Sequence, residues 1–302
     1  MRKSLFTVVA TALLATASFG HAQQDPAAGY KWPVTPWHVH QLTPTVYFVD
    51  GGGGNSGVIV GQHGVIVFDA KTTADGGKKL LEFITKITPK PVTTVILSHS
   101  DVDHVGGLPS FPKGITIIAQ ENDLKELQAN LAANPATALP AEYFPNKIVA
   151  KNKEDITIDG IKMELLHWAP AHTSGDMMLY LPDQKILFCG DIVTANRARP
   201  LIHLEKNGSS EGWITTMKGA LTLNVVQYVP GHGDVIGSKE PLQSMLSDAQ
   251  TESAKIKELV AQGKSLQEIE SAVGDPTPAE AAGPPFAPYS EVVYLELTKK
   301  KP

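Results

Sequence analysis

The sequence predicts a mixed α and β fold in which two β-sheets pack face to face between outer layers of helices. Short β-branched and aromatic runs, broken by glycines, recur through both halves of the chain and predict strands. Stretches with helical spacing of apolar residues separate these runs. Two strand-rich halves, each with helices on its outside, indicate a sandwich of sheets between helix layers.

The first half is expected to begin with an extended arm, residues 23–43, which is rich in proline and aromatic side chains. Apolar runs then predict strands at 46–49, 57–60, 65–68, 92–97 and 115–118. Helical spacing predicts helices at 73–87 and 121–133. Residues 134–150 contain several prolines, and we expect them to form a loop or lid.

The second half repeats this pattern. Strands are expected at 156–158, 163–166, 177–181, 186–189 and 225–229, and helices near 211–222 and over 241–262. We find no linker long enough to separate a second domain. Residues 44–302 are therefore expected to form one domain.

The first 22 residues have the pattern of a secretory signal peptide. Arg2 and Lys3 precede the largely apolar or small stretch 4–20, and residues 20–22 match the small-x-small pattern that signal peptidase cleaves. The mature chain is expected to begin near Gln23 and to be periplasmic or secreted, with an uncleaved anchor as the alternative. Loss of the two cations leaves 24 basic and 31 acidic side chains, a net charge of -7.

The composition is that of an ordinary globular protein: 302 residues, 42% hydrophobic and 19% charged. A net charge of -5 provides no basic surface for nucleic acid. We expect a small-molecule substrate, no nucleic-acid partner and no membrane contact after signal cleavage; the oligomeric state stays open. The single cysteine, Cys189, permits no internal disulfide, so stability is expected to come from the core and bound metal.

The strongest functional signal is the segment 99–104, which follows the apolar run 92–97. His99, Asp101, Asp103 and His104 place four metal-binding side chains within six residues. If the strand stays extended, His99, Asp101 and Asp103 share one face, and Gly106-Gly107 then permit a tight turn that brings in His104. Imidazole and carboxylate together suit zinc, manganese or iron.

Three further signals lie at strand ends or in turns between strands. His172 lies in a turn-rich stretch between two expected strands, and Asp191 follows the buried run 186–190. His232 follows another apolar strand. Ligands at strand ends on a rigid sheet are a usual way to fix metal geometry, so these residues and the segment 99–104 predict one metal site.

These motifs, in this order, resemble those of the metallo-β-lactamase superfamily of metallohydrolases, over roughly Val46 to Gly237. The resemblance implies an αββα sandwich, two mixed sheets flanked by helices, with a dinuclear metal site at one sheet edge. It implies that His99, residue 101 and His172 hold the first metal. Asp103, His104 and His232 would hold the second metal, and Asp191 would bridge both. The family's early aspartate is matched by Asp69, which the resemblance implies is not a direct ligand.

One position departs from the family pattern, because Asp101 stands where the family has a second histidine. A carboxylate there adds negative charge at the first metal and is a harder donor, which favours iron or manganese relative to zinc. Flavodiiron-type members similarly carry a carboxylate at this position. We expect two divalent ions, zinc first and iron or manganese as alternatives; a third outcome is that Asp101 turns away and the first site binds weakly.

The implied chemistry is hydrolysis of an ester, lactone, thioester, amide or phosphoester bond by a metal-bridging hydroxide. Asp103 is the expected catalytic residue, since it would bind metal and orient the nucleophile or carry a proton. The alternatives are an iron-dependent oxidoreductase of the same fold, a β-lactamase-like antibiotic hydrolase, and a binding protein without turnover.

Several weaker candidates are also present. The pair His38 and His40 has metal-like spacing but is more typical of a surface arm. Arg197, Arg199 and His203 follow Asp191 and are candidates for binding an anionic substrate group. The glycines at 51–54 are expected to form a mobile rim of the active site rather than a phosphate cradle, because no helix and lysine follow in the required pattern.

Overall fold

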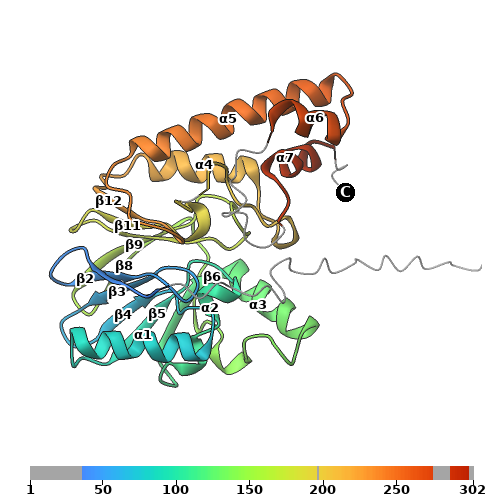
Figure 1. The fold of residues 1–302 in the computed structure, drawn as a ribbon. Helices are drawn as coiled ribbons and strands as arrows, with labels where there is room; N and C mark the ends of the chain where they lie inside the picture. The colour runs from blue at the N-terminus through green and yellow to red at the C-terminus, as the bar shows by residue number, and fades with distance from the viewer. Residues whose placement is uncertain (1–35, 196, 275–285, 299–302) are drawn as a thin grey trace, which may run out of the picture.

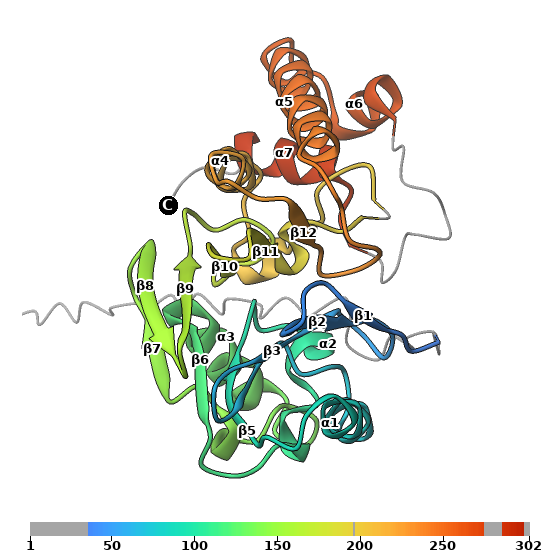
Figure 2. The ribbon, with the colours of Figure 1, turned by 90° about the vertical axis from the view of Figure 1, so that its left-hand side faces the viewer.

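The computed structural model describes residues 36–195, 197–274 and 286–298, so the expected signal peptide and most of the expected arm lie outside the described residues. Two β-sheets pack face to face with helices on both outer surfaces, as Figures 1 and 2 show. The predicted αββα sandwich is confirmed.

The first sheet has seven strands in the order β1-β2-β3-β4-β5-β6-β7. Strands β1 to β4 pair antiparallel, and β4 to β7 pair parallel. The strands are β1 (Val39–Gln41), β2 (Val46–Val49), β3 (Ser56–Val60), β4 (Val65–Phe68), β5 (Val92–Ile96), β6 (Thr116–Gln120) and β7 (Lys147–Val149).

The second sheet has five strands in the order β12-β11-β10-β9-β8. All of its neighbours are antiparallel except β11 and β12, which run parallel. The strands are β8 (Lys153–Ile158), β9 (Ile161–Leu166), β10 (Met178–Leu181), β11 (Ile186–Phe188) and β12 (Gln227–Val229).

Helices form the two outer layers. In Figure 1, α1 and α3 lie on the outer side of the first sheet, and α4 to α7 lie beyond the second. The helices are α1 (Ala74–Ile87), α2 (Val102–Val105), α3 (Glu121–Ala133), α4 (Ser210–Ala220), α5 (Glu240–Ala261), α6 (Leu266–Val273) and α7 (Tyr289–Thr298). Among the described residues, none of these helices has the length and apolar character needed to span a bilayer.

Three apolar clusters fill the spaces between the four layers of helices and sheets. One joins the two sheets and includes Phe68 of β4 and Phe188 of β11, whose ring centroids lie 5.6 Å apart. A second joins the first sheet to α1 and α3, and a third joins the second sheet to α4 to α7 around Trp213. The inner strands are therefore buried on both faces, which explains why strands such as β4 are continuously apolar.

Two connecting segments contain strands that the sequence did not predict. Strand β1 lies within the expected arm, because His40 pairs with Phe48 in the sheet and stacks on its ring at 4.3 Å. Strand β7 and a 3-10 turn at Ala141–Tyr143 lie within the expected lid at 134–150. Val149 ends β7 and is buried between the sheets, so this segment completes the sheet rather than covering a cleft.

Candidate metal centre

The segment 99–104 lies just beyond β5, but its backbone differs from the predicted extended strand. Strand β5 ends at Ile96, and α2 supplies one helical turn with Asp101 as its N-cap. Backbone N–H groups of His104 and Val105 donate to the carbonyl of Asp101, at 2.9 and 3.1 Å. The helical turn, rather than strand alternation, therefore brings Asp103 and His104 to the centre.

The predicted glycine turn is also corrected. Gly106 and Gly107 have φ values of -64° and -82°, which other residues adopt readily. A Cβ on Gly106 would lie 1.9 Å from the carbonyl oxygen of Thr72, and one on Gly107 would lie 1.8 Å from that of Ala70. Glycine is required because α2 packs directly on the backbone that follows β4.

The second sheet supplies the other three predicted ligands from its connecting segments. His172 lies in the loop between β9 and β10, and Asp191 lies on a 3-10 turn, Gly190–Ile192, just after β11. His232 follows β12, the parallel neighbour of β11. Because parallel strands end at the same edge of a sheet, Asp191 and His232 emerge side by side.

The structure brings all seven predicted ligands together. Around Asp103, its Oδ2 lies 3.1 Å from Nε2 of His232 and 3.6 Å from Nε2 of His104. Around Asp101, its Oδ2 lies 3.2 Å from Nε2 of His172 and 3.5 Å from Nε2 of His99.

Asp191 lies between these two groups. Its Oδ1 is 3.2 Å from Nε2 of His104, and its Oδ2 is 3.4 Å from His232 and 3.9 Å from His172. This position agrees with the bridging role that the family resemblance implies.

Three of the ligand histidines have their Nδ1 atoms held by oxygen partners. Nδ1 of His104 lies 2.8 Å from Oδ2 of Asp69, and Nδ1 of His99 lies 2.8 Å from the hydroxyl of Ser98. Nδ1 of His172 lies 2.8 Å from the carbonyl oxygen of Leu201. Such contacts fix the ring so that Nε2 faces the centre, as is usual for metal-binding histidines.

Asp69 follows β4 and supports the centre without entering it. Its carboxylate accepts hydrogen bonds from the backbone N–H and the hydroxyl of Ser98, at 2.7 and 2.6 Å, and contacts His104. Its φ of 62° lies in the left-handed region, which aspartate adopts more readily than most residues.

Strong charge interactions hold the buried centre together. Burial opposes a charged His172, but Asp101 raises its pKa to about 9. Burial also opposes a charged His232, but Asp191 and Asp103 raise its pKa to about 10. For Asp191, burial would raise the pKa, but His232 and His104 hold it well below the ordinary value. The carboxylates are therefore ionised at neutral pH and attract positive charge into the centre.

The residues present fit a pair of metal ions. Among the described residues, several buried ligand atoms have no hydrogen-bond partner: Nε2 of His99, Nε2 of His104, Oδ2 of Asp103 and Oδ1 of Asp191. Leaving polar atoms unpaired inside a protein is costly unless something else satisfies them. Imidazole nitrogens and carboxylate oxygens are ligands that zinc, manganese and iron accept.

Three residues near the first group were not predicted as part of it. His203 is fully buried, with Nε2 3.3 Å from Oδ2 of Asp101, and Glu205 contacts its Nδ1. Lys206 forms a short ion pair with Oδ1 of Asp101. From the sequence, His203 is only a candidate for binding an anionic substrate group; the spacing His203-x-Glu205-Lys206 is the only sequence signal for this cluster.

Loops from opposite halves of the chain are joined beside the centre. The side-chain amide of Asn55 donates to the carbonyls of Pro230 and Gly233, at 2.9 and 2.8 Å, and so fixes the loop that carries His232. The buried amino group of Lys71 donates to the carbonyls of Val49 and Gly54, at 2.6 and 2.8 Å. The glycine stretch 51–54 is thus anchored at both ends.

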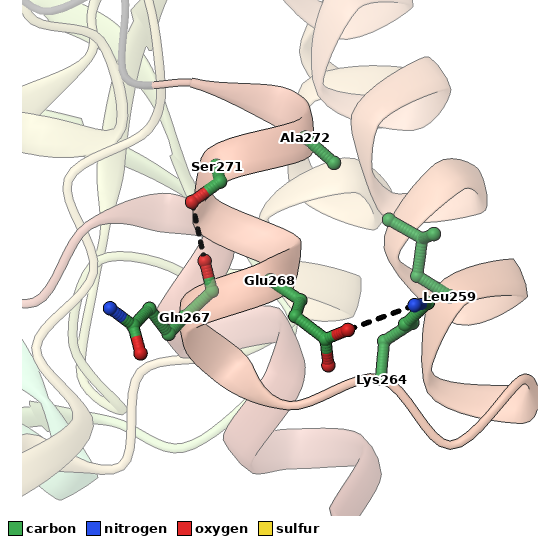
Figure 3. A pocket seen from close by; sticks show the side chains of 6 residues that line it. All are labelled: Leu259, Lys264, Gln267, Glu268, Ser271 and Ala272. Atoms are coloured by element: carbon green, nitrogen blue, oxygen red, sulfur yellow. Dashed lines mark hydrogen bonds and ion pairs between the residues drawn. The ribbon is translucent and has the colours of Figure 1, made fainter.

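The other weaker candidates lie outside the centre. His38 and His40 meet Asp50 instead, at 3.1 and 3.2 Å, on the partly exposed edge of the first sheet. Arg199 pairs with Glu252 of α5. Figure 3 shows a hollow between the end of α5 and α6, lined by Leu259, Lys264, Gln267, Glu268, Ser271 and Ala272. None of these lining residues belongs to the centre, and an ion pair of 2.8 Å between Lys264 and Glu268 accounts for its charges.

The chain is similar in sequence to known proteins. A family model described as "Metallo-beta-lactamase superfamily" matches residues 49–232. The chain is 27% identical over 211 residues to 2,4-dinitroanisole O-demethylase subunit alpha of Nocardioides sp. (strain JS1661), covering 68% of this chain and 60% of that protein. It is 22% identical over 229 residues to linear primary-alkylsulfatase of Pseudomonas sp. (strain ATCC 19151), covering 63% and 43%.

Solved structures share the fold. The structure of the stereoselective inverting sec-alkylsulfatase from Pseudomonas sp. matches with a TM-score of 0.72 at 19% identity, covering 88% of this chain and 51% of that one. The metallo-beta-lactamase from Pontibacter korlensis matches with a TM-score of 0.60 at 20% identity, covering 71% and 99%. The chain thus spans only about half of the sulfatase structure. With a family model that covers most of its sheets and every predicted ligand, the chain belongs to the metallo-beta-lactamase superfamily.

Proposed function

We propose that this chain is a dinuclear metal-dependent hydrolase that acts on a small molecule with an ester-class bond. The observation that carries the proposal is the convergence of seven expected ligand side chains, Asp191 among them, from the two halves of the sandwich, with buried Nε2 and carboxylate atoms close together. Several of these buried atoms lack a hydrogen-bond partner among the described residues, and metal ions bound between them would satisfy them.

Two divalent ions bound here would supply Lewis acidity and lower the pKa of a bound water. His99, Asp101 and His172 would hold one ion, Asp103, His104 and His232 the other, and Asp191 would contact both. Asp103 would also orient the water and accept its proton. The side chain of His232 is 25% exposed, whereas those of His99, His104 and His172 are fully buried. Substrate is therefore expected to approach from the His232 side.

The substrate class is proposed from the chemistry and the named relatives. Sulfate esters are the first candidates, because two of the similar proteins are alkylsulfatases and one of them shares the fold over 88% of this chain. Carboxylate esters, lactones, thioesters, amides and phosphoesters remain in the proposed class. The relative named as an O-demethylase adds aryl methyl ethers to the panel.

The test is metal content together with turnover. The purified chain is loaded with zinc or manganese, its metal content is measured, and it is assayed on alkyl sulfates, esters, lactones, 2,4-dinitroanisole and β-lactams. We expect two ions per chain and hydrolysis that is lost in Asp191→Asn but kept in Asp159→Asn. Asp159 is a carboxylate in the turn between β8 and β9, bonded to His63 and Gly64 rather than to the ligands. Two bound ions without turnover on the whole panel would favour a binding protein instead.

One observation supports a second candidate, an iron-dependent oxidoreductase. Asp101 places a carboxylate oxygen where the family has an imidazole, and oxygen donors favour iron or manganese. Stoichiometric iron in protein isolated without added metal, together with oxygen consumption, would establish this alternative. The β-lactamase-like alternative predicts turnover of β-lactams before other substrates in the panel.

We also propose that the protein is exported, on the signal-like pattern of the first 22 residues. Cell fractionation with mass spectrometry of the N-terminus tests this proposal, and a chain retaining Met1 in the cytoplasm would refute it.

A further inference from the structure

His203 lies at the first ligand group, although the ligand pattern that the family resemblance implies does not include it. It is fully buried and directly precedes a 3-10 turn, Leu204–Lys206. Its backbone N–H donates to the carbonyl of His172 at 2.7 Å, and the two imidazole centroids lie 4.6 Å apart. The backbone thus holds His203 beside an expected metal ligand.

Three imidazoles converge on one oxygen atom. Oδ2 of Asp101 lies 3.2 Å from Nε2 of His172, 3.3 Å from Nε2 of His203 and 3.5 Å from Nε2 of His99. Ligand atoms about 2.0–2.2 Å from a tetrahedral zinc ion are separated from one another by about 3.3–3.6 Å. The three separations from Oδ2 of Asp101 are close to this range, so each of these nitrogens can share an ion with that oxygen.

The Nδ1 atom of His203 also has an oxygen neighbour, as do those of His99, His104 and His172. Oε1 of Glu205 lies 2.5 Å from Nδ1 of His203 in an ion-pair contact. By hydrogen-bond geometry, neither ring nitrogen of His203 has a partner among the described residues. A carboxylate behind a histidine is a recurring support for metal-binding imidazoles, because it fixes the ring and raises its basicity.

Asp101 is oriented to leave one oxygen for the histidines. Its Oδ1 pairs with the ammonium of Lys206, at the end of the same 3-10 turn, while Oδ2 faces the three imidazoles. The positive charge of Lys206 offsets the negative charge that Asp101 brings in place of a histidine. The turn 204–206 thus supplies the positive charge that balances the carboxylate of Asp101.

We propose that His203 is an additional ligand of the first metal ion, beside His99, Asp101, His172 and the shared Asp191. Glu205 would position His203, and Lys206 would neutralise Asp101. This inference rests on the proposed dinuclear centre. In it, the imidazole of His203, from another loop, takes the place of the second histidine that the family has at position 101.

The first test uses wild-type protein and needs no variant. Chain labelled with 15N in its histidines is loaded with 113Cd, a probe for the zinc site. A one-bond coupling between cadmium and Nε2 of His203 is expected, in addition to couplings at His99 and His172. Coupling at His99 and His172 but not at His203 would overturn the inference.

The second test measures affinity by competition with a chelator, using zinc. His203→Ala should lower the affinity for one of the two zinc ions by at least about 10-fold, because loss of even an outer partner of a ligand lowers metal affinity about 10–100-fold. Glu205→Gln should lower the affinity for the same ion by about 10–100-fold. The control is His167→Ala, a buried histidine whose Nδ1 contacts the carbonyl of Asp176, 2.7 Å away. It should bind both ions as the wild type does.

The outcomes separate this inference from the proposed function. If wild type and His203→Ala both bind two zinc ions with equal affinity, the inference fails and the dinuclear centre stands. If the wild type binds no pair of ions, the proposed function fails and the inference with it. Circular dichroism of each variant establishes that the chain is folded before its affinity is compared.

Discussion

Asp69 offers a sharp test of how the protein around the ligands controls metal binding. Its carboxylate accepts two hydrogen bonds from Ser98 and contacts Nδ1 of His104 at 2.8 Å. Asp69→Asn keeps the size of the side chain, and asparagine tolerates the φ of 62° better than most residues do. The substitution therefore removes the charge behind His104 with little change in backbone conformation.

The expected loss follows from the role of such partners. Removing an outer carboxylate typically lowers metal affinity 10–100-fold, which corresponds to about 1.4–2.8 kcal/mol. The effect should fall on the ion held by Asp103, His104 and His232, because Asp69 touches only His104 among the ligands. Zinc affinity for each site is measured by competition with a chelator, and unfolding of the metal-free protein is measured in parallel.

Asp159→Asn is the matched control. Asp159 also has a positive φ, 49°, and its Oδ2 accepts two hydrogen bonds of 2.7 Å from the backbone N–H groups of His63 and Gly64. Both variants should lower stability, since hydrogen bonds to a charged group contribute about 1.5–3 kcal/mol. Only Asp69→Asn should lower metal affinity. Equal zinc affinity in the two variants, or a change of less than twofold for Asp69→Asn, would refute this reasoning.

Three further predictions concern the same region. Asp101→His should shift the metal preference towards zinc, and Asp101→Ala should weaken the first ion selectively; identical metal content and preference in wild type and both variants would contradict ligation by Asp101. The raised pKa values of His172, about 9, and His232, about 10, mean that zinc must displace protons at pH 7. Zinc affinity should therefore rise from pH 6 to 9, and calorimetry in buffers of different ionisation enthalpy should detect proton release. The unfolding free energy of the metal-free protein should instead fall as the pH rises. The raised pKa values of His172 and His232 stabilise the folded state fully below about pH 6.5, and that contribution is lost as the pH rises through 9 to 10. Lys71→Met removes the donor to the carbonyls of Val49 and Gly54 and should lower the unfolding free energy by about 1–3 kcal/mol in denaturant titrations; unchanged stability would show that the glycine stretch needs no such anchor.

The predicted positions of the ligands agree with the structure where a ligand directly follows a buried strand. Asp191 and His232 follow short apolar runs, and these runs form the parallel neighbours β11 and β12. A polar residue directly after a buried strand can be placed from the sequence, because the end of the strand fixes where it emerges. The αββα layers were predictable for the same reason, since hydrophobic periodicity reports burial.

Features that depend on contacts between distant segments were not predictable. The helical turn of α2 replaces an expected extended segment, because Gly106 and Gly107 let it pack on the backbone after β4. His203 lies in a stretch without periodicity, and its approach to Asp101 depends on a backbone hydrogen bond to His172. Strand β7 contains only three residues, too few for alternation to distinguish it from a loop.

The ligands come from both sides of the sandwich, and this division has a mechanical consequence. His99, Asp103 and His104 belong to the half built on the first sheet, whereas His172, Asp191 and His232 belong to the half built on the second. Metal ions that bind only when both halves are packed together would stabilise that packing. A free metal concentration one hundred times the dissociation constant adds about 2.7 kcal/mol to the unfolding free energy. Chelation should therefore loosen this edge first, admitting water towards Phe68 and Phe188 and making the stripped protein prone to aggregation and proteolysis there.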